Sequence, residues 1–111
     1  ATKARIKSLD FQKQANIAAA EWQEDQLKTE HANTLRAYEQ SLYQYRYFRD
    51  QALPNAEEII SAAQLSYRTG DITYMEYLFS LQTATDVKLN YLKSIQQVND
   101  AVIQIYYLIN K

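Results

Sequence analysis

The side chains best suited to metal binding or proton transfer in this chain surround its single histidine. His31 follows Glu30 directly, and Glu24 precedes it by about two helical turns. A zinc site needs three or four ligands at defined spacing, and no second histidine and no cysteine occur to complete one. A lone histidine on a helix is usually structural or solvated. We therefore predict no metal site and no cofactor.

The adjacent carboxylates Glu57 and Glu58 are the next candidates, as a general acid and base. They closely follow Pro54, where carboxylates meet the favourable N-terminal dipole of a helix, and this structural role accounts for them. With one glycine in 111 residues, the chain cannot supply a glycine-rich phosphate loop or a G-x-S-x-G turn, and it has no H-E-x-x-H pattern. We predict that the protein is not an enzyme.

Residues 43–49, Tyr-Gln-Tyr-Arg-Tyr-Phe-Arg, combine aromatic rings with cations, as surfaces that bind single-stranded nucleic acid do. On a helix these rings would point in different directions. The net charge of the chain is −1, whereas nucleic-acid-binding domains are typically basic. We predict no nucleic-acid partner.

The composition predicts an elongated, all-α chain. Helix-forming residues dominate, while one glycine and one proline leave little material for loops. Apolar runs are far shorter than the roughly 20 residues of a membrane-spanning helix. The chain starts at Ala1 within an apparently helical pattern, so we expect it to be part of a longer protein.

Residues of about 3–68 are expected to form one long helix with a narrow apolar seam. From His31 onward, seam positions alternate at spacings of four and three, as in a coiled coil. The predicted seam is His31, Leu35, Tyr38, Leu42, Tyr45, Arg49, Ala52, Ala56, Ile59, Ala63 and Ser66. Before His31 the pattern weakens, and this part of the helix is expected to outrun its partner.

Pro54 interrupts this long helix without changing the phase of its seam. Proline removes one backbone donor and disfavours helical geometry at the preceding Leu53. A new helix could start there, with Pro54 in its first turn. Because the seam keeps its phase, we instead predict a kink near 53–54 within one pseudo-continuous rod.

Residues of about 72–110 are expected to form the second helix, and they carry two seams. The first predicted seam is Tyr74, Tyr77, Leu81, Ala84, Lys88, Tyr91, Ile95, Val98, Val102, Ile105 and Ile109. The second, mixed seam is Met75, Leu78, Gln82, Thr85, Leu89, Leu92, Gln96, Asn99, Ile103 and Tyr106. A hairpin needs one seam, so the second indicates further neighbours, unless it only widens one core face.

The turn between the helices is predicted at Thr69–Asp71, around the single glycine of the chain. Gly70 can adopt the positive φ that ends a helix, and Tyr67 can pack on the last turn before it. Asp71 or Thr73 can cap the returning helix. The fold expected is thus one long antiparallel, coiled-coil-like helical hairpin over residues 1–111.

The turn and its flanks resemble a known family. Residues 67–78, Tyr-Arg-Thr-Gly-Asp-Ile-Thr-Tyr-Met-Glu-Tyr-Leu, followed by Leu81 and Gln82, are similar to the periplasmic-tip segment of the TolC-like outer membrane factors. The sequence of this segment is most similar to that of their heavy-metal efflux branch (CzcC- and CusC-like), which includes versions fused to an inner-membrane cation pump. Residues 52–57 and 99–108 match the same family pattern, so the resemblance covers essentially the whole chain.

The resemblance implies a trimeric duct whose α-helical barrel crosses the periplasm below an outer-membrane β-barrel. Tyr67, Thr69, Gly70 and Asp71 would then lie at the tip that docks to the periplasmic adaptor protein. Glu76 would match an acidic position that lines the closed aperture in some members. The chain would be a passive conduit, working with an adaptor and an inner-membrane cation pump.

The chain departs from the family pattern at two places. It also has two alternative interpretations. Ile72 stands where some members carry a latching arginine, and Asn110-Lys111 replaces a glycine at the helix end. The main alternative is a structural coiled-coil hairpin that serves only self-association. An adaptor hairpin fits less well, because the first arm is so much longer than the second. Either way, the exposed seam predicts association of the isolated chain into dimers or larger species.

Overall fold

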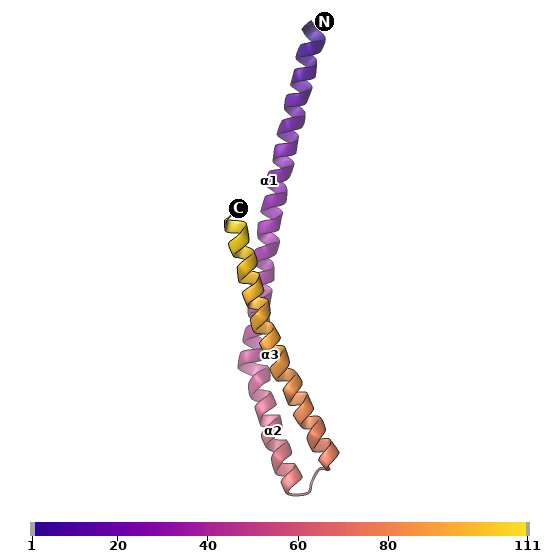
Figure 1. Ribbon diagram of the computed structural model, residues 1–111, viewed down its shortest axis with the longest axis vertical. Coiled ribbons are helices and arrows are strands. Elements are labelled where there is room, and N and C mark those ends of the chain that lie inside the picture. Colours follow the sequence, from indigo (N-terminus) through magenta and orange to yellow (C-terminus); the bar gives the residue numbers. More distant parts are fainter. Residues whose placement is uncertain (1, 111) are drawn as a thin grey trace.

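The chain folds into a long antiparallel helical hairpin. The computed structural model describes residues 2–110, and the molecule measures 98 × 23 × 15 Å. In chain order the elements are α1 (Thr2–Tyr47), the π-helix η1 (Phe48–Ala52), α2 (Leu53–Arg68) and α3 (Tyr74–Ile109). The first three form one rod, and α3 runs back along α2, η1 and the C-terminal part of α1 (Figure 1). The predicted all-α hairpin is confirmed.

The π-helix η1 keeps the rod continuous just before Pro54. Tyr47, Ala52 and Leu53 all have right-handed helical dihedrals, and the Leu53 N–H donates to the Phe48 carbonyl, the wider π-helical bond. Proline lacks an N–H and its ring clashes with the preceding turn, and a widened turn accommodates both. The irregularity therefore lies at 48–52, slightly before the predicted 53–54, and the rod changes direction gently there (Figure 1).

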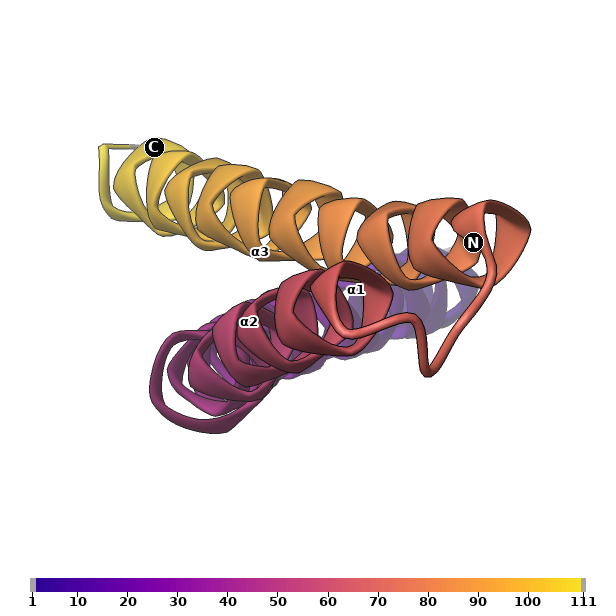
Figure 2. The same cartoon turned by 90° about the horizontal axis from the view of Figure 1, so that it is seen from below.

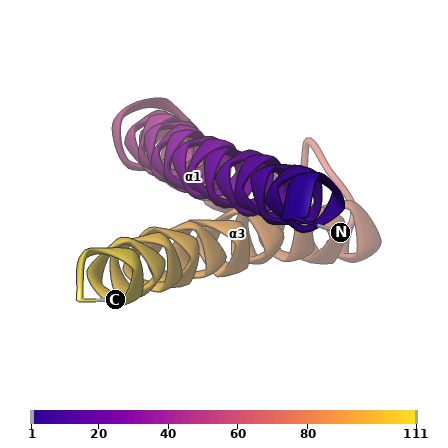
Figure 3. The same cartoon turned by 90° about the horizontal axis from the view of Figure 1, so that it is seen from above.

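Small side chains form the centre of the contact between α3 and the rod. The most buried residues are Ser41, Ala56, Ala63, Ala84 and Ser94, and Ala84 is completely buried. The separation of two packed helices depends on the side chains between them, so alanine and serine permit a close approach. Figures 2 and 3, which look along the molecule from its two ends, show the rod and α3 as two adjacent rows of turns.

The seam on α3 matches the predicted one at seven of eleven positions and differs at the other four. Tyr77, Ala84, Tyr91, Val98 and Ile105 are buried or half-buried, as predicted. The alternate positions are Ser80, Val87, Ser94, Ala101 and Leu108, while the predicted Tyr74, Lys88, Val102 and Ile109 are exposed. Leu81 and Ile95 remain half-buried beside the small residues. At Ser80, Ser94 and Ala101 the prediction favoured larger neighbours, whereas these small residues lie against the rod.

On the rod, too, some predicted seam residues are exposed and adjacent residues pack against α3 in their place. Its buried or half-buried residues include the predicted Tyr38, Leu42, Tyr45, Ala52, Ala56, Ala63 and Ser66. The predicted His31, Leu35, Arg49 and Ile59 are exposed, and Thr34, Ser41, Phe48 and Ile60 pack instead. Part of this shift follows from η1. A π-helical turn holds more residues than an α-helical turn, so it changes which residues of the rod face α3.

The second predicted seam of α3 is exposed along its whole length. It comprises Met75, Leu78, Gln82, Thr85, Leu89, Leu92, Gln96, Asn99, Ile103 and Tyr106, and we refer to it as the second face of α3. Its larger apolar members include Leu92, which is 59% exposed, and Tyr106. Within one hairpin, nothing covers this face.

The N-terminal part of α1 extends beyond the end of α3 and is likewise uncovered. Every residue from 2 to 33 is exposed, and the first half-buried side chain is that of Thr34. We call residues 2–33 the overhang; Figure 1 shows most of it, in indigo and violet, above the C-terminal end of α3. The overhang confirms that the first helix outruns its partner.

Within residues 2–110, no helix combines the length and the apolar character needed to cross a bilayer.

Candidate functional site

The turn between α2 and α3 is built around Gly70. Its φ is +81°, and no other residue of the described chain has a positive φ. The Asp71 N–H donates to the Ser66 carbonyl at 2.8 Å and the Gly70 N–H donates to the Tyr67 carbonyl at 3.1 Å. This pair of bonds is the Schellman motif, which satisfies the free carbonyls at the end of a helix. Gly70 thus has the predicted role in reversing the chain.

The start of α3 is capped by Thr73. Its side-chain oxygen accepts a hydrogen bond from the Glu76 N–H at 3.2 Å, which satisfies one of the free amides of the first turn. Asp71, the other predicted cap, instead accepts a hydrogen bond from Thr69 Oγ1 at 2.9 Å. The connection therefore spans residues 69–73, two residues longer than predicted, and α3 begins at Tyr74.

Three tyrosines join the two helices at the tip. The Tyr67 ring stacks on Tyr77, with centroids 5.0 Å apart and planes 15° apart, and it contacts Tyr74 at 5.9 Å. Tyr67 nevertheless stays 43% exposed. Tyr67 thus has a structural role across the hairpin, as well as the exposure that docking would require.

The predicted tip residues gather at one end of the molecule. Tyr67, Thr69, Gly70 and Asp71 are exposed there, and Ile72 is half-buried within the turn. Glu76, the predicted aperture residue, is exposed in the first turn of α3, where its carboxylate meets the favourable helix dipole. The tip offers hydroxyl, carboxylate and aromatic groups for polar docking.

A second polar cluster surrounds η1 and was not predicted. Asp50 accepts hydrogen bonds from Arg49 Nε at 2.7 Å and from Arg49 Nη2 at 3.0 Å. This bidentate pair raises the pKa of Arg49 and holds the pKa of Asp50 below its usual value. Arg49 and Asp50 both lie in the π-helix at 48–52, and the signal of an irregularity in the sequence was Pro54.

Two tyrosines extend this cluster across the hairpin. The Arg49 guanidinium lies 5.4 Å from the centre of the Tyr45 ring, and Tyr45 stacks on Tyr91 of α3 at 5.9 Å. Hydrogen bonding with Tyr45, together with partial burial, raises the pKa of Tyr91. The cluster links the irregular part of the rod to the middle of α3, and it is a structural junction.

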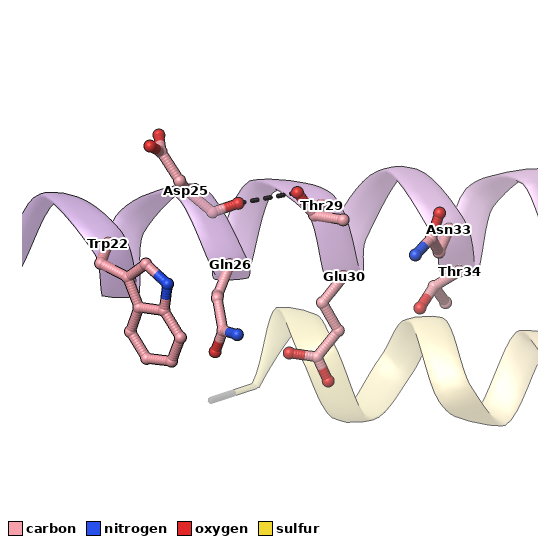
Figure 4. A pocket seen from close by; sticks show the side chains of 7 residues that line it. All are labelled: Trp22, Asp25, Gln26, Thr29, Glu30, Asn33 and Thr34. Carbon is pink, nitrogen blue, oxygen red and sulfur yellow. Dashed lines mark hydrogen bonds between the residues drawn. The ribbon is translucent and has the colours of Figure 1, made fainter.

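The surface hollows are open depressions along the helices. One of them, with a volume of about 550 Å³, is lined by Trp22, Asp25, Gln26, Thr29, Glu30, Asn33 and Thr34. All seven belong to α1, near the point where α3 ends (Figure 4). In Figure 4 Thr29 Oγ1 donates to the Asp25 carbonyl, at 2.9 Å, so this hydroxyl is used by the helix itself.

Metal ligands do not cluster in the described part of the chain. No group of three or more histidine, cysteine, aspartate or glutamate side chains within residues 2–110 could hold an ion. His31 is exposed on α1 and does not take part in the seam that had been predicted for it.

No family model, curated protein or solved structure matches this chain. The resemblance to the outer membrane factors therefore depends on the residues quoted for it.

Proposed function

We propose that this chain is the periplasmic helical hairpin of an outer-membrane efflux duct, acting as a passive conduit in a tripartite export system for heavy-metal cations. The resemblance of residues 67–78 gives the class of protein. The observation that carries the proposal is the exposed second face of α3. A single hairpin does not need a second, partly apolar face, whereas a wall of many helices does.

In such a wall each helix has a neighbour on two sides. The rod covers the side of α3 that carries Ala84 and Ser94, and the second face, with Leu89 and Leu92, would contact an adjacent hairpin. Closure of this arrangement into a ring gives every copy the same environment, as cyclic symmetry requires. The proposed assembly is the trimeric duct of the resembling family, anchored in the outer membrane and crossing the periplasm.

The tip supports the second part of the proposal, docking to a periplasmic adaptor. The Schellman turn and the Tyr67–Tyr77 stack hold the end of the hairpin in a defined shape. Asp71 and Thr69 are exposed on this shape, so a partner could bind them without refolding the turn. Glu76 would line the aperture, and the inner-membrane pump would supply the cations, which pass through the water-filled duct without coordination.

The alternative, a hairpin that serves only self-association, uses the same second face but does not need the tip. Docking at the tip therefore discriminates between these two functions. The experiment is a binding titration between this chain and the helical hairpin of the periplasmic adaptor from the same transport system.

We expect binding to be lost in Gly70→Pro, which cannot adopt a φ of +81°, and in Asp71→Lys, which reverses the exposed charge. Glu57→Lys is the matched control, because Glu57 is an exposed carboxylate on α2 away from the turn. Unchanged affinity in both tip variants would reject docking and favour the self-associating hairpin.

A further inference from the structure

We infer that one side of α3 lines the water-filled lumen of the duct through a row of polar side chains, which we call the polar row. The polar row takes every seventh residue along α3, and its members are Glu76, Thr83, Asn90, Gln97 and Gln104. All five are exposed in the hairpin. This inference rests on the proposed function, because a lumen exists only if the hairpin is part of a duct.

The polar row keeps a constant position beside the contact between α3 and the rod. Each member directly precedes one of five residues that are buried or half-buried in the hairpin, namely Tyr77, Ala84, Tyr91, Val98 and Ile105. Successive residues of an α-helix lie about 100° apart around its axis. Because these five residues follow the contact along α3, the polar row stays on one side of it over nearly the whole length of the helix.

The row on the other side of the same contact is mostly apolar. Its members lie four residues after the same buried or half-buried residues, and they are Leu81, Lys88, Ile95, Val102 and Ile109. A step of four residues turns about 40° past a full turn, in the opposite sense to the polar row. The two sides of α3 therefore differ in chemistry, with Lys88 as the one charged residue among the apolar ones.

Two surface hollows between α1 and α3 show the same difference. The polar hollow, of about 430 Å³, is lined by Ala37, Gln40, Ser41, Gln44, Gln97, Asp100, Ala101 and Gln104. The other hollow, of about 280 Å³, is lined by Leu42, Tyr45, Ile95, Val98 and Asn99. The polar hollow thus holds four glutamine amides and a carboxylate, two of the amides from the polar row. The other hollow includes Ile95 of the apolar row, so the rod extends the chemistry of each side.

The chemistry of the polar row suits the lumen better than that of the apolar row. In a closed wall of helices, one side of each hairpin faces the lumen and the other faces outward. Cations that pass without coordination keep their water shells, so the lining must be hydrated along its length. Glutamine and asparagine amides donate hydrogen bonds to water and accept them from it, whereas apolar side chains do neither. The polar row therefore belongs on the lumen side.

Carboxylates on this side would favour cations over anions in the lumen. Glu76 begins the polar row near the tip, and Asp100 lines the polar hollow. Within residues 2–110 neither carboxylate forms an ion pair, so their charges are not neutralised by the hairpin itself. In a symmetric trimer each carboxylate recurs in every copy around the lumen, and rings of carboxylates attract cations.

The side that faces the lumen is tested by ion current through the complete duct in a planar lipid bilayer. Asn90→Cys places a thiol on the polar row, in a hairpin that has no cysteine of its own. The matched control is Lys88→Cys, an exposed position two residues away on the other side of α3. A maleimide carrying a long polyethylene glycol chain is added from the outer-membrane end. We expect a stepwise loss of current in Asn90→Cys, one step for each copy, and no loss in Lys88→Cys.

Reversal of a charge gives a second readout in the same bilayer. Asp100→Lys should shift the reversal potential in a salt gradient toward that of the anion, because it replaces a ring of carboxylates by a ring of ammonium groups. Lys88→Asp makes a charge change of the same size on the other side of α3, and it should leave the reversal potential unchanged. Both residues are exposed, so both variants should keep the fold of the hairpin.

The outcomes separate failure of the inference from failure of the proposed function. Absence of an ion-conducting pore in the unsubstituted protein would reject the proposed function, and the inference with it. A conducting pore that the maleimide blocks equally at both positions, only at Lys88→Cys, or at neither would overturn the inference and leave the proposed function in place. A shift of the reversal potential as large in Lys88→Asp as in Asp100→Lys would overturn it as well.

Discussion

The stacked rings of Tyr67 and Tyr77, 5.0 Å apart, join the last turn of α2 to the first turns of α3. Tyr67 also contacts Tyr74, so one side chain of the rod holds two of the returning helix. This arrangement makes the tip a small packed unit at the end of an otherwise slender hairpin, and it explains why a short, glycine-dependent turn can keep a defined shape.

Tyr67→Ala should destabilise the hairpin by about 1 kcal/mol, because it removes a stacked aromatic pair at the tip. Denaturant unfolding followed by the helical circular dichroism signal measures the change. Tyr43→Ala serves as control, since Tyr43 is 76% exposed and is expected to contribute little. Equal effects of the two substitutions would show that the stack adds nothing to stability.

Gly70→Ala should cost about 1–2 kcal/mol, entirely from the positive φ of this residue. A methyl group at this position would meet no atom within 4 Å, so steric clash does not contribute. Gly70→Asn should cost less, because asparagine tolerates this conformation better than alanine. The comparison of the two unfolding curves checks the prediction, and a larger loss in Gly70→Asn would contradict it.

Ala84→Leu should destabilise the hairpin by about 1–3 kcal/mol, because Ala84 is completely buried where the two helices approach closely. The neighbouring Thr85→Leu, on the exposed second face, is the matched control and should cost little. Thermal unfolding of the two variants distinguishes them. A neutral Ala84→Leu would mean that the helices are not closely packed at this point.

The pair of Arg49 and Asp50 predicts a pH dependence near η1. The pKa of Asp50 is lowered from 3.8 by its hydrogen bonds to Arg49, so the pair stabilises the fold above pH 3.8. This contribution is lost as the pH falls through the lowered pKa of the folded state. In an NMR titration, the Asp50 carboxyl should titrate below 3.8, and Arg49→Gln should move its midpoint upward. An unchanged midpoint in Arg49→Gln would reject the pairing.

The hairpin, its reversal at Gly70 and its unequal arms could all be predicted from the sequence. A single glycine between two helical patterns left one position for the turn, and the heptad spacing gave Tyr77, Ala84 and Tyr91 correctly. The alternate seam positions could not be found from apolarity alone. Ser80, Ser94 and Ala101 face the rod although they are small, and a search for large apolar side chains selects their neighbours instead.

The details of the tip and of the rod depended on backbone geometry that the residue types do not specify. Asp71 and Thr73 were both reasonable caps, and the hydrogen bond to the Glu76 N–H selects Thr73. Pro54 indicated an irregularity, but the π-helix that accommodates it lies at 48–52 and brings Arg49 onto the Tyr45 ring. The proline indicates that the helix is disturbed, but not at which turn the wider geometry forms.

The most direct test of the central claim, that this hairpin is one wall segment of a periplasmic duct, is thiol labelling of the protein in its own cells. The reagent should pass the outer membrane but not the inner membrane. We predict rapid labelling of Lys93→Cys, which lies outside both seams of α3, and slow labelling of Leu92→Cys, which a neighbouring hairpin would cover. Equal labelling of the two positions, or no labelling of Lys93→Cys, would contradict the claim.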